Sequence, residues 1–217
     1  MVAEQAMSAI SKILPLKPSH SLLASMQKAR MKILSGRFKN TTIPFRPSPQ
    51  LRPTPDKVRL AVMAVLGEKI AEANVLDLFC GTGALGLEAL SRGARRVVFV
   101  EKHKPLCSGL AQLLVKLGEG GASEVIGAGA VSALAGLAEA GERFDIVLAD
   151  PPYEKGMGEM FLHDLDRHDI LNAGAVVAVE VRKTEALPDA TDRLKKVKSA
   201  VYGDTAVHYY LKIPPVA

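Results

Sequence analysis

Tryptophan is absent from the sequence, and aromatic residues make up only 5% of its 217 residues. Broad surfaces of stacked aromatic side chains are therefore not expected. Cysteine is also scarce, because the chain has only Cys80 and Cys107. Two cysteines are too few to cross-link a chain of this length, which excludes a disulfide-built scaffold and favours the reducing cytoplasm. No apolar run approaches the roughly 20 residues that cross a bilayer, so we expect neither a membrane span nor a membrane partner.

Metal-ligand patterns are missing as well. The five histidines and two cysteines show no metal-ligand spacing, so no metal is expected. The remaining composition, with 48% hydrophobic and 24% charged residues, is that of an ordinary globular protein. The length suits one domain with a small appendage, and we expect a monomer.

Negative charge is nearly absent from the first part of the chain. Residues 1–60 hold eleven Lys or Arg against two acidic residues, whereas the rest holds 17 basic and 21 acidic residues. The first segment is therefore strongly basic and the remainder mildly acidic. This asymmetry favours a polyanionic partner, of which nucleic acid is the commonest, although a solvated tail without a partner would have the same composition.

The chain divides into three segments. We interpret residues 1–30 as a mobile extension or a mis-assigned start, with Met31 as the beginning. Residues 31–53 are expected to form a β-hairpin, with strands at 32–34 and 41–43, followed by a proline-rich stretch. Residues 54–217 form the main domain, whose first helix is expected to begin with Thr54 as its N-cap and Pro55 in its first turn.

From Asn74 onward, short apolar segments alternate with helical patterns. Strands are predicted at residues 75–79, 96–100, 124–126, 145–149, 175–181 and 207–212. Helices are predicted at residues 84–91, 105–117, 131–140 and 161–165. Such alternation, with strands that are apolar on both faces, predicts an α/β fold with a mostly parallel sheet covered by helices on both sides. The run of three lysines at residues 195–198 is interpreted as a solvated face rather than a binding patch.

A glycine-rich turn follows the first strand of this pattern. Residues 81–86 read Gly-Thr-Gly-Ala-Leu-Gly, between a predicted strand and a predicted helix, and Glu101 ends the next strand twenty positions after Gly81. This arrangement lets the backbone approach a ligand closely, and it lets a carboxylate accept hydrogen bonds from a ribose diol. A nicotinamide dehydrogenase is therefore allowed by this motif, as is a glycine turn without a ligand.

Asp77 argues against a dinucleotide. It lies inside the apolar strand, where dinucleotide-binding folds place an apolar residue, and a buried carboxylate is costly without a cationic or hydrogen-bonding partner. The α-ammonium group of S-adenosylmethionine would be such a partner. The pattern of Asp77, Phe79, Gly81 and Gly83 is therefore better explained by this cofactor, while a carboxylate satisfied by backbone N–H groups alone remains the alternative.

The tetrapeptide Asp150-Pro151-Pro152-Tyr153 follows another buried strand. It therefore lies at the carboxyl edge of the sheet, where open α/β folds bind ligands. Two prolines hold the backbone rigid, so the Asp150 carboxylate and the Pro151 carbonyl can both accept protons from one exocyclic amino group. Tyr153 can stack on the base that carries it. The alternative is a β-turn with a surface tyrosine.

These motifs occur together with others that identify a family. The chain also carries Gly-Arg-Phe-Lys at residues 36–39, Leu-Arg-Pro-Thr-Pro-Asp-Lys-Val-Arg at residues 51–59, and Tyr-Gly-Asp-Thr at residues 202–205. In this combination it resembles the RsmD family over residues 31–212. Members of that family use S-adenosylmethionine to methylate the N2 amino group of a guanine, guanine 966, in bacterial 16S ribosomal RNA. The resemblance implies a Rossmann-like class I methyltransferase fold with a seven-stranded sheet whose last strand is antiparallel.

The resemblance also implies a set of functional residues, and a partner in 16S rRNA or the small ribosomal subunit. The expected cofactor-binding residues are Asp77, Phe79, Gly81, Gly83, Glu101, Lys102, Gly129 and Ala130. The expected catalytic residues are Asp150, Pro151, Pro152 and Tyr153. The expected RNA-binding residues are Arg37, Lys39, Arg52 and Arg59.

Two positions depart from the family pattern. Gly129 stands where relatives place Asp or Asn to bind adenine, so we expect the adenine to contact the backbone at Ala130 and apolar neighbours. The hairpin segment Asn40-Thr41-Thr42 is less basic than in relatives, which predicts a weaker contact with RNA. Two other functions remain compatible with the same motifs, namely a DNA adenine-N6 methyltransferase and a non-catalytic RNA-binding module.

Overall fold

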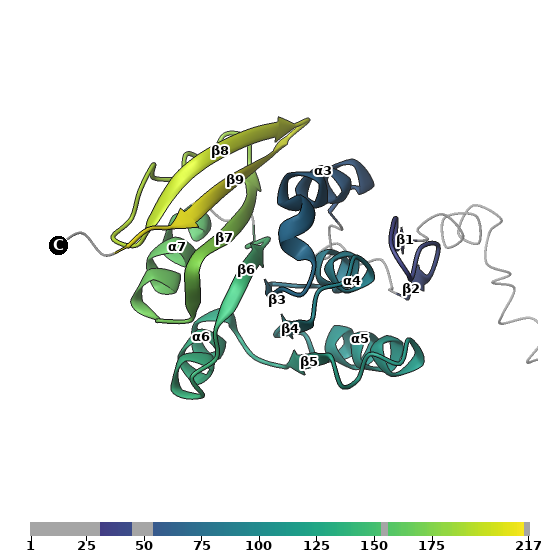
Figure 1. Cartoon of the computed structure of the whole chain (residues 1–217). Coiled ribbons are helices and arrows are strands. Elements are labelled where there is room, and N and C mark those ends of the chain that lie inside the picture. Colours follow the sequence, from purple (N-terminus) through teal and green to yellow (C-terminus); the bar gives the residue numbers. More distant parts are fainter. Residues whose placement is uncertain (1–30, 45–53, 153–155, 215–217) are drawn as a thin grey trace, which may run out of the picture. The chain divides into compact units, whose positions relative to one another are not determined.

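A computed structural model describes residues 31–44, 54–152 and 156–214 of the chain (Figure 1), and these residues belong to one compact unit that begins at Met31. The predicted extension, residues 1–30, lies outside the described part, as do Arg52 and Tyr153. No helix of the described ranges is long and apolar enough to cross a membrane.

The centre of the fold is a seven-stranded sheet with the strand order β5-β4-β3-β6-β7-β9-β8. Its strands are β3 (Asn74–Leu78), β4 (Arg96–Val100), β5 (Ser123–Ile126), β6 (Phe144–Ala149), β7 (Leu171–Arg182), β8 (Leu194–Tyr202) and β9 (Thr205–Lys212). Strands β3 to β7 pair in parallel, whereas β9 is antiparallel to both β7 and β8. The predicted mostly parallel sheet with an antiparallel last strand is confirmed.

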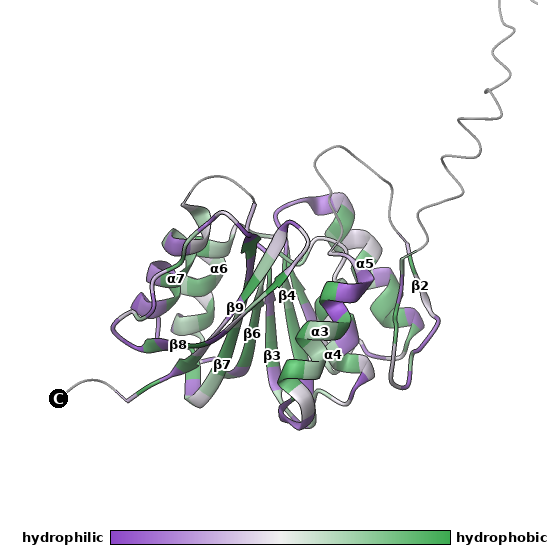
Figure 2. Cartoon of the chain, turned by 90° about the horizontal axis from the view of Figure 1, so that it is seen from above, coloured by the Kyte–Doolittle hydropathy of each residue, from purple (hydrophilic) through white to green (hydrophobic). Residues whose placement is uncertain are grey.

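Helices cover both faces of the sheet (Figure 2). The helices on one face are α3 (Asp56–Leu66), which the short helix η1 (Gly67–Ile70) follows, α4 (Ala84–Ser91) and α5 (Lys104–Lys116). The helices on the other face are α6 (Ala130–Glu139) and α7 (Met157–Arg167). Successive strand residues point to opposite faces, so Val75 and Val97 join the first core while Leu76 and Val98 join the second. This double burial explains why the strands are apolar throughout.

One strand of the sheet was not among the six predicted from the sequence. Strand β8 contains the lysine run and forms an outer edge of the sheet, where it pairs with β9. Lys195 and Lys198 are exposed, and the Lys196 ammonium donates to Asp189 Oδ1 at 2.9 Å and to the Leu187 carbonyl at 2.7 Å. Lysines suit an edge strand because they discourage pairing with another chain.

The N-terminal hairpin packs against the α3–α4 side of this unit. Its strands are β1 (Met31–Lys32) and β2 (Thr42–Ile43), shorter than predicted, and Met31, Ile33 and Ile43 join the same core as α3 and α4. The hairpin loop reaches the end of α4, where the Arg37 N–H donates to the Ser91 carbonyl at 2.8 Å. Gly36 has φ +78°, and a Cβ there would lie 1.9 Å from the same carbonyl oxygen, so this close approach requires glycine.

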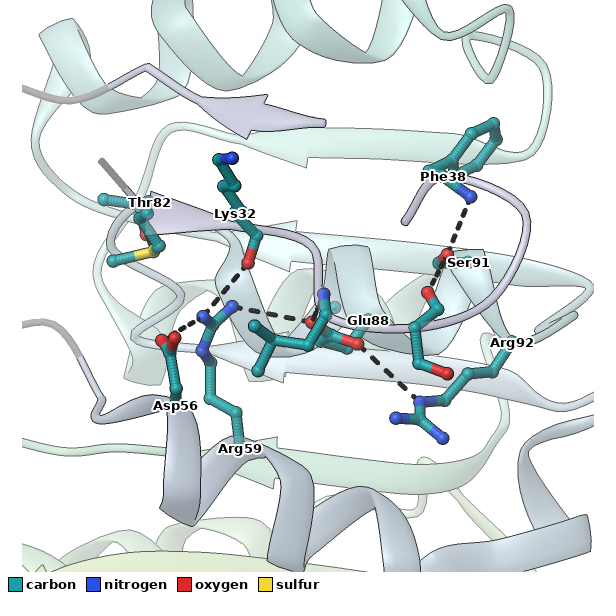
Figure 3. A network of polar contacts seen from close by, with 12 residues as sticks. Lys32, Phe38, Asp56, Arg59, Thr82, Glu88, Ser91 and Arg92 are labelled. Carbon is teal, nitrogen blue, oxygen red and sulfur yellow. Dashed lines mark hydrogen bonds and ion pairs between the residues drawn. The ribbon is translucent and has the colours of Figure 1, made fainter. Parts of the chain in front are cut away.

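A buried network of charged groups joins the hairpin to α3 and α4 (Figure 3). The Arg59 guanidinium donates to the Lys32 carbonyl at 3.1 Å and to Asp56 Oδ1 at 2.6 Å, and it lies 3.6 Å from Glu88 Oε1. The same Glu88 oxygen accepts the Leu34 N–H. Burial raises the pKa of Glu88, an effect that Leu34, Arg59 and Arg92 partly offset.

This network corrects one prediction. The Arg59 side chain has 0% exposure and bonds to protein groups, so the prediction that it binds RNA is wrong. Arg59 belongs to a basic segment of the sequence, but its position on α3 directs its side chain inward, toward Glu88.

Candidate active site

The carboxyl ends of β3, β4 and β6 open onto one large cavity. The chain runs from β3 outward to β4 and β5 and then returns to β6 on the other side of β3, and such a reversal of strand order separates the connecting loops and leaves a crevice between them. The cavity has a volume of about 1770 Å³. This exceeds the roughly 300–1,000 Å³ of a typical small-molecule site, so it has room for more than one ligand.

Part of the glycine-rich turn lines this cavity. Phe79, Gly81 and Gly83 all have positive φ, at +60°, +55° and +76°. Two glycines adopt this conformation without strain, whereas Phe79 is an outlier of the kind that concentrates at ligand sites. Phe79 and Gly81 line the cavity, but Gly83 does not. A Cβ at Gly83 would lie 2.7 Å from Leu110 Cδ1, so this glycine serves the packing of α4 against α5.

Asp77 is buried at the edge of the cavity, as predicted. Its Oδ2 accepts the Gly86 N–H at 2.8 Å. A Cβ at Gly86 would lie 2.9 Å from this oxygen and 2.3 Å from Phe99 Cε1, so the third glycine of the motif is what lets α4 approach the strand. Burial raises the pKa of Asp77 to about 7, although the hydrogen bond from Gly86 opposes the shift. A cation bound beside Asp77 would therefore stabilise the ionised form of this buried carboxylate.

Glu101 lies at the end of β4 and is held by two backbone amides. Its Oε2 accepts the Gly81 N–H at 3.0 Å and its Oε1 accepts the His103 N–H at 2.8 Å. These bonds fix the carboxylate relative to the glycine-rich turn. Glu101 and Lys102 both line the cavity, so the structure brings the predicted acid and the turn together.

The start of α6 forms another wall. Gly129 precedes the helix and Ala130 begins it, and both line the cavity as predicted. The Gly129 carbonyl accepts the Ser132 hydroxyl at 3.0 Å. Val131 and Leu134 continue the same wall. A planar ring at this wall would meet backbone and apolar side chains rather than an acidic side chain.

The Asp150 loop closes the cavity on the side of β6. Asp150, Pro151 and Pro152 line it, and Asp150 Oδ2 accepts the Thr54 hydroxyl at 3.2 Å. This bond corrects the prediction for Thr54. Helix α3 begins at Asp56 with Pro55 as its N-cap, and its N-terminus has no side-chain cap. Pro55 has extended backbone angles, with φ −57° and ψ 146°, and the Thr54 hydroxyl before it donates to the Asp150 loop instead of capping the helix.

Helix α7 contributes residues that the sequence reasoning missed. Met157, Met160, Phe161 and Asp164 line the cavity, and the Phe161 ring meets Phe79 edge to face with centroids 5.9 Å apart. Their spacing of three and four residues places them on one helical face. That periodicity was available in the sequence, but the predicted helix began only at residue 161.

Three of the residues predicted to bind RNA, Arg37, Lys39 and Arg59, lie in the described part of the chain, and none of them lines the cavity. Arg37 is half exposed and forms a 2.9 Å ion pair with Glu119, and Lys39 is exposed. Arg59 is buried in the network described above. Of the predicted basic set within the described ranges, only Arg37 and Lys39 thus remain available to a partner at the surface.

Comparison with known proteins agrees with this architecture. The family model described as Conserved hypothetical protein 95 matches residues 31–211. The ribosomal RNA small subunit methyltransferase D of Escherichia coli (strain K12) is 33% identical over 194 residues, which cover 89% of this chain and 93% of that protein. The putative rRNA methyltransferase YlbH of Bacillus subtilis (strain 168) is 29% identical over 182 residues, covering 84% of this chain and 99% of that protein.

Solved structures show the same fold. The putative methyltransferase YhhF from Escherichia coli superimposes with a TM-score of 0.75 at 29% identity, covering 85% of this chain and 98% of that one. An RNA methyltransferase from Salinibacter ruber in complex with S-adenosyl-L-homocysteine has a TM-score of 0.59 at 15% identity, covering 76% of this chain and 97% of that one.

The sheet order and the cavity at its switch point are thus those of a methyltransferase. The chain belongs to the Conserved hypothetical protein 95 family, the RsmD family of S-adenosylmethionine-dependent rRNA methyltransferases.

Proposed function

We propose that this protein transfers a methyl group from S-adenosylmethionine to the exocyclic N2 of a guanine in 16S rRNA of the small ribosomal subunit, guanine 966 by family resemblance. The observation that carries the proposal is the shared cavity. The Asp77 and Glu101 carboxylates, the glycine-rich turn and the Asp150 loop all border it. A cofactor at the turn and a base at the Asp150 loop would therefore meet in one cavity.

The residues around the turn suit the cofactor. The Asp77 carboxylate would bind the α-ammonium group, since burial raises its pKa and no cation of the described residues offsets that shift. Glu101 would accept hydrogen bonds from the ribose diol, because two backbone amides already orient it. Gly129 and Ala130 would contact the adenine ring together with the apolar wall of α6. When bound, S-adenosylmethionine supplies a methyl group activated by its sulfonium.

The Asp150 loop would prepare the acceptor. Guanine N2 is a weak nucleophile because its lone pair is conjugated with the ring, so positioning must supply much of the rate. The Asp150 carboxylate and the Pro151 carbonyl would accept hydrogen bonds from the two N2–H groups, which turns the lone pair out of the ring plane and toward the methyl group. Once the methyl group has moved from the sulfonium to N2, which leaves S-adenosylhomocysteine, the nitrogen would release its extra proton to the Asp150 carboxylate or to solvent, so no strong base is needed first. Tyr153, which lies outside the described residues, would stack on the base.

Two substrate classes can be separated by direct assay. We expect labelled methyl groups from S-adenosylmethionine to enter guanine N2 of 16S rRNA, in naked RNA or in small ribosomal subunits that lack the family's modification. Duplex DNA with unmethylated adenine serves as the competing acceptor. Label in adenine N6 alone would establish the DNA enzyme, and tight cofactor binding without label in any acceptor would favour the non-catalytic RNA-binding module.

Cofactor affinity is expected to weaken in mild acid. The free protein holds the Asp77 pKa at about 7, and an ammonium group binds the ionised carboxylate, so protonation competes with binding. The dissociation constant of S-adenosylmethionine should rise from pH 7.5 to pH 5.5, approaching tenfold per pH unit below pH 7. S-adenosylhomocysteine, which keeps the ammonium but lacks the sulfonium, should show the same dependence in calorimetric titrations.

The Asp77→Asn variant provides the control. It should bind more weakly at pH 7.5 and show a flat profile, since the amide does not titrate in this range. A flat profile in the unaltered protein would contradict the role of Asp77. The raised pKa has a second consequence for the free protein: this group contributes stability when protonated, and that contribution is lost as the pH rises through 7.

A further inference from the structure

Thr54 forms a hydrogen bond that crosses between two parts of the chain 96 residues apart. It lies just before helix α3 on the cavity wall, and its hydroxyl donates to Asp150 Oδ2 at 3.2 Å. The hydroxyl of a threonine offers one donor, and here that donor is used on the carboxylate of the loop that would hold the base.

The helix that follows Thr54 does not depend on this side chain. Pro55 is the N-cap, and its carbonyl accepts the Val58 and Arg59 N–H groups at 2.9 and 3.0 Å. Threonine before a helix usually serves as its cap, and that role is not filled by Thr54 here. The hydroxyl can therefore donate to the Asp150 loop without depriving helix α3 of a capping hydrogen bond.

The position of Thr54 is nevertheless tightly determined. Arg59 lies in the first turn of α3 and is fully buried, where it bonds to the Lys32 carbonyl of the hairpin and lies 3.6 Å from Glu88 of α4 (Figure 3). Buried side chains in such a network have little freedom to move. The start of α3 is therefore anchored to both the hairpin and α4, and Thr54 extends from this anchor toward Asp150.

We propose that Thr54 is a positioning residue for methyl transfer. Its hydroxyl fixes the orientation of the Asp150 carboxylate in the cavity, so that this carboxylate meets the amino group of the incoming base in a productive geometry. This inference rests on the proposed function of Asp150. It also links the N-terminal segment to the catalytic loop, since the threonine that orients Asp150 is placed by the helix that anchors the hairpin.

The test compares Thr54→Val with Thr54→Ser in single-turnover methylation of 16S rRNA. Valine has nearly the same shape and lacks the hydroxyl, so the methylation rate at saturating substrates should fall about tenfold or more, the loss typical of one hydrogen bond to a charged group. The KM for RNA and the affinity for S-adenosylmethionine should stay within about twofold, because only orientation at the reacting centre is lost. Serine keeps the donor and should restore the rate.

Thr191→Val provides a matched control. The Thr191 hydroxyl oxygen also takes part in a hydrogen bond of 3.2 Å, with the Leu194 N–H, and Thr191 does not line the cavity. Its replacement should leave the methylation rate unchanged. Melting temperatures of all variants are recorded, and we expect Thr54→Val to melt close to the unaltered protein.

Several outcomes would overturn the proposal. These outcomes are a normal methylation rate in Thr54→Val, a rate in Thr54→Ser as low as that of Thr54→Val, and a joint loss of folding and cofactor binding in the valine variant, which would show a structural role. Asp150→Ala, assayed in parallel, distinguishes a failure of the proposed role of Thr54 from a failure of the proposed role of Asp150. If Asp150→Ala is inactive while Thr54→Val is normal, only the role of Thr54 is wrong. If Asp150→Ala retains normal activity, the proposed function of the loop fails.

Discussion

Replacement of Asp150 by alanine is expected to lower methyl transfer on the order of 10³-fold while S-adenosylmethionine still binds. Groups that are aimed at the charge developing in a transition state commonly contribute 10²–10³-fold each, and alanine removes the carboxylate altogether. Asp77 and Glu101, which also line the cavity, are unchanged in this variant. The measurement is single-turnover methylation of 16S rRNA together with a calorimetric titration of the cofactor.

Two further variants make this prediction specific. Asp150→Asn keeps one carbonyl acceptor but loses the charge, so we expect an intermediate loss of roughly tenfold, the difference between a charged and a neutral hydrogen bond. Asp164→Asn serves as the matched control, because Asp164 also lines the cavity but its carboxylate forms a 3.2 Å ion pair with Arg167 on the same helix. Normal turnover in Asp150→Ala, or an equal loss in Asp164→Asn, would contradict the assignment of Asp150.

Replacement of Arg59 by methionine is expected to lower the free energy of unfolding by roughly 3–5 kcal/mol at pH 8, the cost of breaking a buried ion pair. Methionine fills the space of the side chain stem but leaves the Glu88 carboxylate buried without its nearest cation, 3.6 Å away. The Lys32 carbonyl of the hairpin loses its donor as well. Urea denaturation, followed by far-ultraviolet circular dichroism, measures the change.

The pH dependence of this loss identifies Glu88 as its source. Burial already raises the pKa of Glu88, and the removal of Arg59 raises it further. A carboxyl group whose pKa is higher in the folded state regains stability as the pH falls through that value. The deficit of Arg59→Met should therefore shrink between pH 8 and pH 5, and a deficit that is equal at both values would contradict this explanation.

Two controls accompany the Arg59 experiment. Arg92→Met removes another cation near Glu88, at 3.7 Å, but its side chain is partly exposed, so the loss should be within about 1 kcal/mol. The double variant Arg59→Met/Glu88→Gln removes both charges and keeps an acceptor for the Leu34 N–H. It should therefore recover much of the stability that the single variant loses at pH 8.

The alternation of strands and helices in the sequence was sufficient to predict most of the fold. Helix α4 and strand β4 have the predicted bounds, because each is an apolar segment between clear turn signals. Strand β8 escaped prediction because Leu194 is its only buried residue and a register shift between Lys196 and Lys198 interrupts its pairing with β9, so it shows no regular apolar alternation. Helix α7 was predicted too short, because its first turns carry the cavity-lining Met157 and Met160 among polar neighbours.

The candidate site likewise contains residues that the sequence predicted and residues whose contacts it did not predict. The glycine-rich turn, Glu101 and the Asp150 loop were predicted because each follows a strand, and the carboxyl ends of parallel strands meet at one edge of the sheet. Asp77 was predicted because it is an acid inside an otherwise apolar strand. Thr54 and Arg59 were assigned the wrong partners. Both roles depend on contacts with residues distant in sequence, Asp150 and Glu88, which no local pattern encodes.

The sequence by itself therefore determined the fold class, the family and the residues at the ends of the strands, because periodicity and turn chemistry are local properties of the chain. The tertiary structure alone decided that Arg59 is an internal anchor, that Thr54 contacts Asp150 rather than capping α3, and that α7 completes the cavity. These are consequences of packing, in which the direction of a side chain and the nature of its neighbour depend on elements brought together from far along the chain.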